Sequence, residues 1–206
     1  MQERCSICFG FTDQLFPPGT HVCQIYSTDE ERQKSVNKFL LAGLHNNECS
    51  SYYSEKANIK ALEEVLASEN ISFAEVIESR TLSLSGTRDA YFPQGRFDPE
   101  KMLGQLRQYH LDAQSGGFAN ARVIGEMSPE IETVEGGERL LEYESKITLL
   151  LREHPITAVC QYAADEFSGA LIMDILKVHP YMIVRGAIVH NPFFIPPEEF
   201  LAPHIH

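Results

Sequence analysis

The sequence predicts an α/β fold: a doubly wound, mostly parallel sheet of about six or seven strands with helices on both faces. The chain has 206 residues, of which 43% are apolar, and this suits one domain with a sizeable core. Short apolar segments of strand type alternate with longer segments of helical periodicity, which is typical of parallel βαβ units with right-handed crossovers. No internal repeat or Gly/Ser/Pro-rich linker divides the chain, so we expect a single α/β domain.

The first half of this domain starts with an expected strand at His21–Tyr26. Two overlapping capping boxes follow it, Ser27 with Glu30 and Thr28 with Glu31, and they predict the start of a helix. The apolar residues of that helix recur at helical spacing and form one buried stripe. The next expected elements are a strand at Cys49–Ser54, a helix from Ile59 to Leu66, a strand at Phe73–Ile77 and a segment at Thr81–Ser85 that extends it or starts a hairpin.

The second half begins with a helix that Asp98 caps and Pro99 opens, and that Gly116-Gly117 ends. The remaining expected elements are a strand at Arg122–Glu126, a helix at Glu138–Glu153, a strand at Ile156–Tyr162, a helix at Gly169–Val178 and a closing strand at Met182–Val189. Residues 1–20, which end in a turn-rich Pro-Pro-Gly segment, and the proline-rich residues 191–206 are expected to lie outside the core.

The composition excludes several classes of protein. The 17 Lys and Arg against 29 Asp and Glu give a net charge of −12, which argues against direct nucleic-acid binding because phosphates require a basic face. No apolar run is long enough to span a membrane, and the N-terminus lacks the basic and apolar regions of a signal peptide. Five cysteines, an odd number in a chain of this size, argue against a secreted disulfide scaffold. We therefore expect a cytoplasmic protein.

The junction after the first strand has the context of a phosphate-binding loop but not its chemistry. Lys34-Ser35 lies where a G-x-x-x-x-G-K-[ST] motif would end, yet Thr28 and Gln33 occupy the two glycine positions. Without glycines the backbone amides cannot wrap phosphates closely. The carboxylates of Asp29-Glu30-Glu31 would also repel a triphosphate. The sequence therefore predicts neither ATP binding nor ATPase activity.

Polar and aromatic side chains follow the expected strands at their carboxyl ends. They are Tyr26, Ser27, Tyr53, Glu126 and Tyr162. In open α/β sheets ligands bind outside the carboxyl ends of the strands. Tyrosine rings and a few polar groups there are typical of a small-molecule pocket, although loop ends are polar in most proteins. We expect a ligand-binding cleft at this edge.

Glu144 is unusual because it lies on the apolar face of its expected helix. A carboxylate there is costly unless it is paired or hydrogen-bonded. It could face the ligand cleft together with Glu126, as a polar anchor, general base or metal ligand. The favoured alternative is a structural ion pair with Arg122 or Arg139. His179, at the end of a helix, is interpreted as structural.

A second constellation has the residue types of a metal site. Cys5-x2-Cys8 is followed by His21-x-Cys23, and residues two apart on a strand point the same way. Three thiolates and one imidazole could hold zinc or iron. A reactive or merely buried dithiol is the favoured alternative. The terminal His204 and His206 could bind metal only adventitiously.

Several short motifs occur together in one order along the chain. Phe39-Leu-Leu-Ala-Gly-Leu44 with Glu48 resembles the segment after the phosphate loop of RecA/KaiC-like ATPases. The other motifs are His21-Val-Cys23, Gly125-Glu-Met127, Tyr143-Glu144, Cys160-Gln-Tyr162, His179-Pro180 and Asn191-Pro-Phe-Phe194. In this order they resemble the MEDS-type sensory domain, named for methanogen and methylotroph regulators.

The resemblance implies a RecA/KaiC-like fold whose phosphate loop has been lost, over residues 21–194, with an N-terminal segment at 1–20 and a tail at 195–206. Such domains accompany histidine kinases and transcriptional regulators and are thought to sense small one-carbon or hydrocarbon-type molecules. Because no kinase or helix-turn-helix segment is present in the sequence, a stand-alone sensory module would signal through a separate partner such as a histidine kinase or regulator. It could also form a homo-oligomer.

Two alternatives to a ligand-sensing module remain open at this stage. One is a thiol- or metal-dependent redox sensor that uses Cys5, Cys8, His21 and Cys23. The other is a protein-interaction module on a degenerate ATPase fold. Neither a nucleophile elbow, a zinc-protease motif nor a dinucleotide glycine fingerprint is present in the sequence, so we expect no enzymatic activity.

Overall fold

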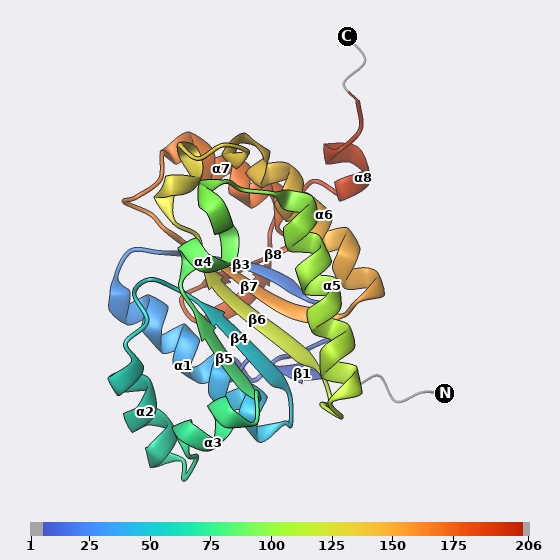
Figure 1. Cartoon of the computed structure of the whole chain (residues 1–206). Helices are drawn as coiled ribbons and strands as arrows, with labels where there is room; N and C mark the ends of the chain where they lie inside the picture. The colour runs from blue at the N-terminus through green and yellow to red at the C-terminus, as the bar shows by residue number, and fades with distance from the viewer. Residues whose placement is uncertain (1–5, 204–206) are drawn as a thin grey trace.

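The centre of the protein is one twisted sheet (Figure 1). A computed structural model describes residues 6–203. The seven strands follow the order β5-β4-β6-β7-β3-β8-β9, and all neighbours pair in parallel except β8 and β9. In chain order the strands are β3 (His21–Tyr26), β4 (Cys49–Tyr53), β5 (Leu82–Ser85), β6 (Ala121–Glu126), β7 (Ile156–Ala163), β8 (Tyr181–Val184) and β9 (Ala187–His190). The expected mostly parallel α/β sheet is confirmed.

Helices cover both faces of the sheet, and each face has one apolar cluster between its helices and the strands. One face carries α1 (Asp29–His45), α2 (Ile59–Ser68) and α3 (Phe73–Glu78), and the other carries α5 (Pro99–Ser115), α6 (Leu140–Glu153) and α7 (Gly169–Val178). The short helices α4 (Thr87–Tyr91) and α8 (Pro197–Phe200) complete the set, with 3-10 turns at Pro93–Gly95, Pro129–Glu132 and Gly137–Arg139. Within the described residues, none of the helices has the length and apolar character needed to cross a bilayer.

The expected strand at Phe73–Ile77 is wrong, because these residues form helix α3. Ser72 caps this helix, and its hydroxyl accepts a hydrogen bond from the Glu75 amide at 3.3 Å. The apolar residues of the segment also recur at helical spacing, a pattern that a short run does not distinguish clearly from a strand. The strand in this part of the chain is β5, which lies within the segment Thr81–Ser85.

The expected closing strand at Met182–Val189 is two strands, β8 and β9. They pair in antiparallel fashion around Arg185 and Gly186. Both turn residues have positive φ, 51° and 79°. This conformation is the one that two-residue hairpin turns require, because its twist matches that of the flanking strands.

Part of the N-terminal segment belongs to the core, contrary to expectation. A small hairpin of β1 (Ile7–Cys8) and β2 (Leu15–Phe16) lies beside the main sheet. Phe9 is fully buried, and its ring lies 5.6 Å from that of Phe39 on α1. Phe16 packs edge-on against Phe9 at 5.4 Å. The segment therefore adds aromatic side chains to the apolar cluster between α1 and the sheet.

A buried ion pair joins this hairpin to the sheet. Arg122 on β6 has no exposed surface, and its Nε donates to Glu48 at 2.5 Å. The same guanidinium donates to the carbonyls of Phe39 at 2.7 Å and Cys8 at 3.3 Å. Burial lowers the pKa of Arg122, although Glu48 acts in the opposite direction. Arg122 thus ties β6, α1 and β1 together at the amino edge of the sheet.

Replacing Glu48 by glutamine should destabilise the fold strongly, because Arg122 would keep a buried charge without its counterion. We expect a loss of about 3–5 kcal/mol in the free energy of unfolding, measured by urea denaturation. Glu142→Gln is the matched control, since Glu142 pairs with Arg139 at 2.8 Å on the surface of α6. The free energy of unfolding of this control variant should fall much less, because exposed ion pairs contribute little to stability. Equal losses in the two variants would contradict a central structural role for Arg122.

Candidate functional site

The carboxyl edge of the sheet holds a buried carboxylate, that of Glu126 at the end of β6. Glu126 is 4% exposed. The Tyr26 hydroxyl donates to its Oε1, and the Ser54 hydroxyl donates to its Oε2 at 2.5 Å. The Lys56 ammonium lies 3.0 Å from Oε1. Residues at the ends of β3 and β4 therefore converge on the carboxylate that ends β6.

A groove of about 300 Å³ opens above this carboxylate, lined by Tyr26, Ser27, Asp29, Lys56, Ala163, Asp165 and Glu166. Lys56 lies between two acids, because its Nζ is also 2.8 Å from Glu166. Burial lowers the pKa of Lys56, but hydrogen bonds to Glu166 and Glu126 outweigh this effect and raise that pKa above its ordinary value. Lys56 is the only cationic side chain among the described lining residues, so the groove is acidic overall.

The N-terminus of α1 borders the groove, where an ATPase would bind phosphates. Here the chain satisfies its own amides: Thr28 accepts from the Glu31 amide at 3.2 Å, and Glu31 accepts from the Ser27 amide at 3.2 Å. Arg32 points inward, where it donates to Asp29 at 2.8 Å. The capping box thus occupies the Ser27 and Glu31 amides, and the ion pair with Asp29 engages Arg32, so fewer groups at this end are left for a phosphate.

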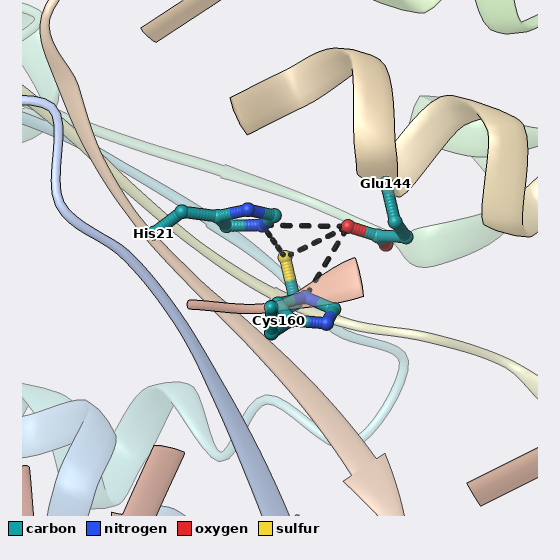
Figure 2. A group of neighbouring side chains, drawn as sticks. His21, Glu144 and Cys160 are labelled. Carbon is teal, nitrogen blue, oxygen red and sulfur yellow. Dashed lines mark hydrogen bonds and ion pairs between the residues drawn. The ribbon is translucent and has the colours of Figure 1, made fainter. Parts of the chain in front are cut away.

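A second polar group is buried under α6, on the opposite face of the sheet (Figure 2). The Tyr162 hydroxyl donates to Glu144 Oε1 at 2.7 Å. Glu144 Oε2 lies 3.4 Å from the Nε2 atoms of both His21 and His179. Cys160 Sγ is 3.6 Å from the same oxygen and 3.5 Å from His21 Nε2. We call His21, Glu144, Cys160 and His179 the Glu144 cluster.

Strand register assembles this cluster. β3 and β7 are parallel neighbours, and side chains two apart point to the same face. His21, at the start of β3, and Cys160, in β7, therefore share the face that α6 covers with Glu144. His179 follows α7 directly, and its ring lies 4.3 Å from that of His21. The order β7-β3-β8 makes this meeting possible.

Burial and the contacts between neighbouring groups together set the pKa values of His21, Glu144 and Cys160. Burial and the neighbouring His179 lower the pKa of His21 to about 4, so that its imidazole is neutral at neutral pH. Burial raises the pKa of Glu144, but His179 and His21 outweigh it, and the pKa lies well below its ordinary value. Burial raises the pKa of the Cys160 thiol well above its ordinary value. An ionised carboxylate is thus enclosed by a neutral imidazole and a thiol.

Comparison with protein-family models identifies the domain. The model described as MEDS, the methanogen/methylotroph DcmR sensory domain, matches residues 20–180. The chain belongs to the MEDS family. Comparison with curated proteins finds no match. The family assignment gives this MEDS domain a sensory role and agrees with the resemblance of the sequence motifs.

Solved structures similar to the MEDS domain are RecA/KaiC-like. The flagellar accessory protein FlaH from Methanocaldococcus jannaschii is 12% identical, with a TM-score of 0.60 over 84% of this chain and 76% of that one. A KaiC-like protein from Pyrococcus horikoshii OT3 is 16% identical, with a TM-score of 0.52 over 81% and 71% of the two chains. At this identity the similarity establishes the fold.

The sheet separates the residues that the sequence analysis placed in one cleft. Glu126 lies on the same face as Ile124, which packs with α1, whereas Tyr162 lies on the face of Cys160, under α6. Tyr53 lies on the same face as Tyr162, where its ring packs against Tyr91 at 6.0 Å beside a cavity of about 20 Å³. Tyr26 and Ser27 remain with Glu126 at the groove.

Neither expected ion pair of Glu144 forms. Arg122 pairs with Glu48, and Arg139 pairs with Glu142. Glu144 does not share a cleft with Glu126 either, because the two carboxylates lie on opposite faces of the sheet. Its partners are Tyr162 and the histidine and cysteine side chains of the cluster.

The predicted metal ligands of the MEDS domain lie in different surroundings. Cys5 lies outside the described residues, as do His204 and His206. Cys8 Sγ accepts from the Gly10 amide at 3.3 Å. Cys23 is buried, and burial raises its pKa to about 12. His21 contributes to the Glu144 cluster, so the four-ligand set with Cys5, Cys8 and Cys23 stays a prediction.

Sequence reasoning overlooked two side chains that contribute to these polar groups, Lys56 and His179. Lys56 follows β4 by only a few residues, so the strand-end rule that selected Tyr53 could also have selected it. His179 was interpreted as structural because of its position at a helix end. Its role in the cluster depends on β8 lying beside β3, a pairing that the sequence does not specify.

Replacing both N-terminal thiols tests whether they have a structural role. Because the Cys8 thiol makes one weak hydrogen bond among residues 6–203, with the Gly10 amide, we expect Cys5→Ser combined with Cys8→Ser to leave the melting temperature nearly unchanged. A structural zinc site would contribute a large part of the folding energy. A drop of many degrees, with near-stoichiometric zinc in the wild type, would contradict this prediction.

Proposed function

We propose that this MEDS domain is a small-molecule sensory module that binds its ligand in the groove at the carboxyl edge and does not hydrolyse nucleotides. The observation that carries the proposal is the Glu126 carboxylate, buried and held by Tyr26, Ser54 and Lys56 beside an open groove. A buried charge with an exposed partner can exchange that partner for a ligand. The sensory role of the family agrees with such a site.

The charges of the groove favour a particular class of ligand. Asp29, Asp165 and Glu166 line it, and Glu126 is bonded to two of its lining residues. Lys56 is 43% exposed, so a ligand can reach it from solvent. A small cation could replace the ammonium of Lys56, and a neutral polar molecule could bond to the carboxylates. An anion would meet repulsion, so we propose a neutral or cationic small molecule.

Signal output would require a second protein. We propose that a separate signalling partner, such as a histidine kinase or transcriptional regulator, reads the state of the groove. Lys56 is suited to transmit that state, because it bridges Glu126 at the sheet and Glu166 in the loop after β7. A ligand that displaces Lys56 would break both contacts and free this loop.

Mg-ATP should not bind with an affinity better than about millimolar, since the amides at the start of α1 are already capped and three carboxylates follow them. Isothermal titration of the full chain with Mg-ATP measures this affinity. A release assay for inorganic phosphate should also show no activity above buffer. A micromolar dissociation constant would overturn the proposal that the phosphate site is lost.

A panel of one-carbon molecules tests the groove. We expect methylammonium and methanol to bind and formate not to bind, as followed by NMR chemical-shift titration. Glu126→Gln should weaken methylammonium binding by about 1.5–3 kcal/mol, the range for hydrogen bonds to charged groups.

Glu142→Gln removes a carboxylate outside the groove and is the matched control, expected to bind as the wild type does. If Glu126→Gln and wild type bind the panel equally, or if formate binds best, the groove is not the sensory site. The interaction-module alternative would then be the better interpretation.

A further inference from the structure

The Glu144 cluster has the dimensions of a metal site. A zinc-type ion lies about 2.0–2.3 Å from each ligand, and tetrahedral geometry then separates the ligand atoms by about 3.3–3.7 Å. In the cluster, Glu144 Oε2 is 3.4 Å from His21 Nε2, 3.4 Å from His179 Nε2 and 3.6 Å from Cys160 Sγ. The four ligand atoms all lie within 4.8 Å of one another.

The histidines are oriented as metal ligands are. His179 Nδ1 lies 2.8 Å from the Ile175 carbonyl, which can only accept, so Nδ1 carries a proton. Its Nε2 is buried, has no hydrogen-bond partner among the described residues, and points at the cluster. His21 Nδ1 is likewise hydrogen-bonded, to the Thr148 hydroxyl at 2.9 Å. Such outer contacts fix the ring and its tautomer in metal sites.

The other two ligands are also held in place. The Tyr162 hydroxyl occupies Glu144 Oε1 and leaves Oε2 facing the two imidazoles. Cys160 lies in the middle of β7, whose backbone is fixed by strands on both sides. All four side chains are 9% exposed or less.

We infer that His21, Glu144, Cys160 and His179 form a closed, four-ligand site for a divalent transition-metal ion, with zinc as the best match. One imidazole pair, one thiolate and one carboxylate are ligands that zinc accepts in tetrahedral sites. When the ion binds, the Cys160 thiol releases its proton to solvent and a sulfur–metal bond forms. The divalent charge is then balanced by the thiolate and the carboxylate, so a neutral centre is buried.

The site is closed, since four protein ligands complete the tetrahedron and leave no position for a substrate. An ion there would join β3, β7, α6 and the chain after α7. It is distinct from the groove, because the two lie on opposite faces of the sheet. It also differs from the N-terminal set of Cys5, Cys8, His21 and Cys23, with which it shares only His21.

Metal analysis of the purified full chain tests this inference. The chain is produced with zinc in the medium, its affinity tag is removed, and its metal content is measured by mass spectrometry. We expect near-stoichiometric zinc in the wild type and a loss of at least about tenfold in Cys160→Ala and in His179→Gln.

Matched controls remove the same chemical groups outside the cluster. Cys23→Ala removes a buried thiol directly beside Cys160 in the register of β3 and β7. His110→Gln removes an imidazole that packs against His154 instead. Both variants should retain the zinc. If Cys23→Ala loses the ion while Cys160→Ala keeps it, the N-terminal set is the site and the inference fails.

X-ray absorption of the zinc-loaded wild type identifies the atoms bound to zinc. This measurement does not depend on whether a variant folds. The Glu144 cluster requires one sulfur and three nitrogen or oxygen neighbours around zinc. Three sulfurs and one nitrogen would instead identify Cys5, Cys8, Cys23 and His21 and overturn the inference. A wild-type chain that holds no zinc, even after refolding with zinc present, would show that protons alone balance Glu144 and would overturn it as well.

Discussion

The structure depends on the compensation of buried carboxylates. Glu144 is enclosed between the sheet and α6, where an isolated charge would cost many kcal/mol, so every neighbouring element must supply a polar group. β3, β7 and the end of α7 each do so. Glu48 at the amino edge of the sheet also needs a charged partner, and Arg122 supplies it. At the carboxyl edge Lys56 is the partner of Glu126. These contacts fix how the helices sit on the strands more specifically than apolar packing alone does.

Two strands connect the groove with the Glu144 cluster. β3 contributes His21 to the cluster at one end and Tyr26 to the groove at the other, and β7 contributes Cys160 to the cluster and Ala163 to the groove. Because these strands are hydrogen-bonded along their whole length, they form one rigid unit. A stiff cluster would therefore hold the groove in a defined geometry, which suits the small-molecule binding proposed for it.

Local signals predicted the regular elements well, since capping and periodicity are encoded within a few neighbouring residues. Helix α7 has the bounds that the sequence predicts, Gly169–Val178, and α5 begins at Pro99 where the Asp98 cap predicts. Phe73–Ile77 was missed because a short apolar run is compatible with either element. The partners of Arg122 and Glu144 could not be derived, because a buried charge requires a partner but does not reveal which distant residue supplies it. The residues of the predicted cleft lie on both faces of the sheet. The rule that ligands bind at the carboxyl ends of strands identifies the edge of the sheet but does not say which face a side chain is on.

The carboxyl edge of the sheet differs in charge from the phosphate-binding edge that a RecA/KaiC-like fold offers to nucleotides. In this fold the loop after the first strand and the helix behind it offer amides and a positive dipole to phosphates. In this chain Thr28 and Glu31 take up amides at that end, and Asp29, Asp165 and Glu166 reverse the local charge. In the proposed function, the groove at this edge would bind neutral or cationic molecules where a phosphate loop binds anions. The absence of glycines from the loop and the surrounding carboxylates both favour that preference.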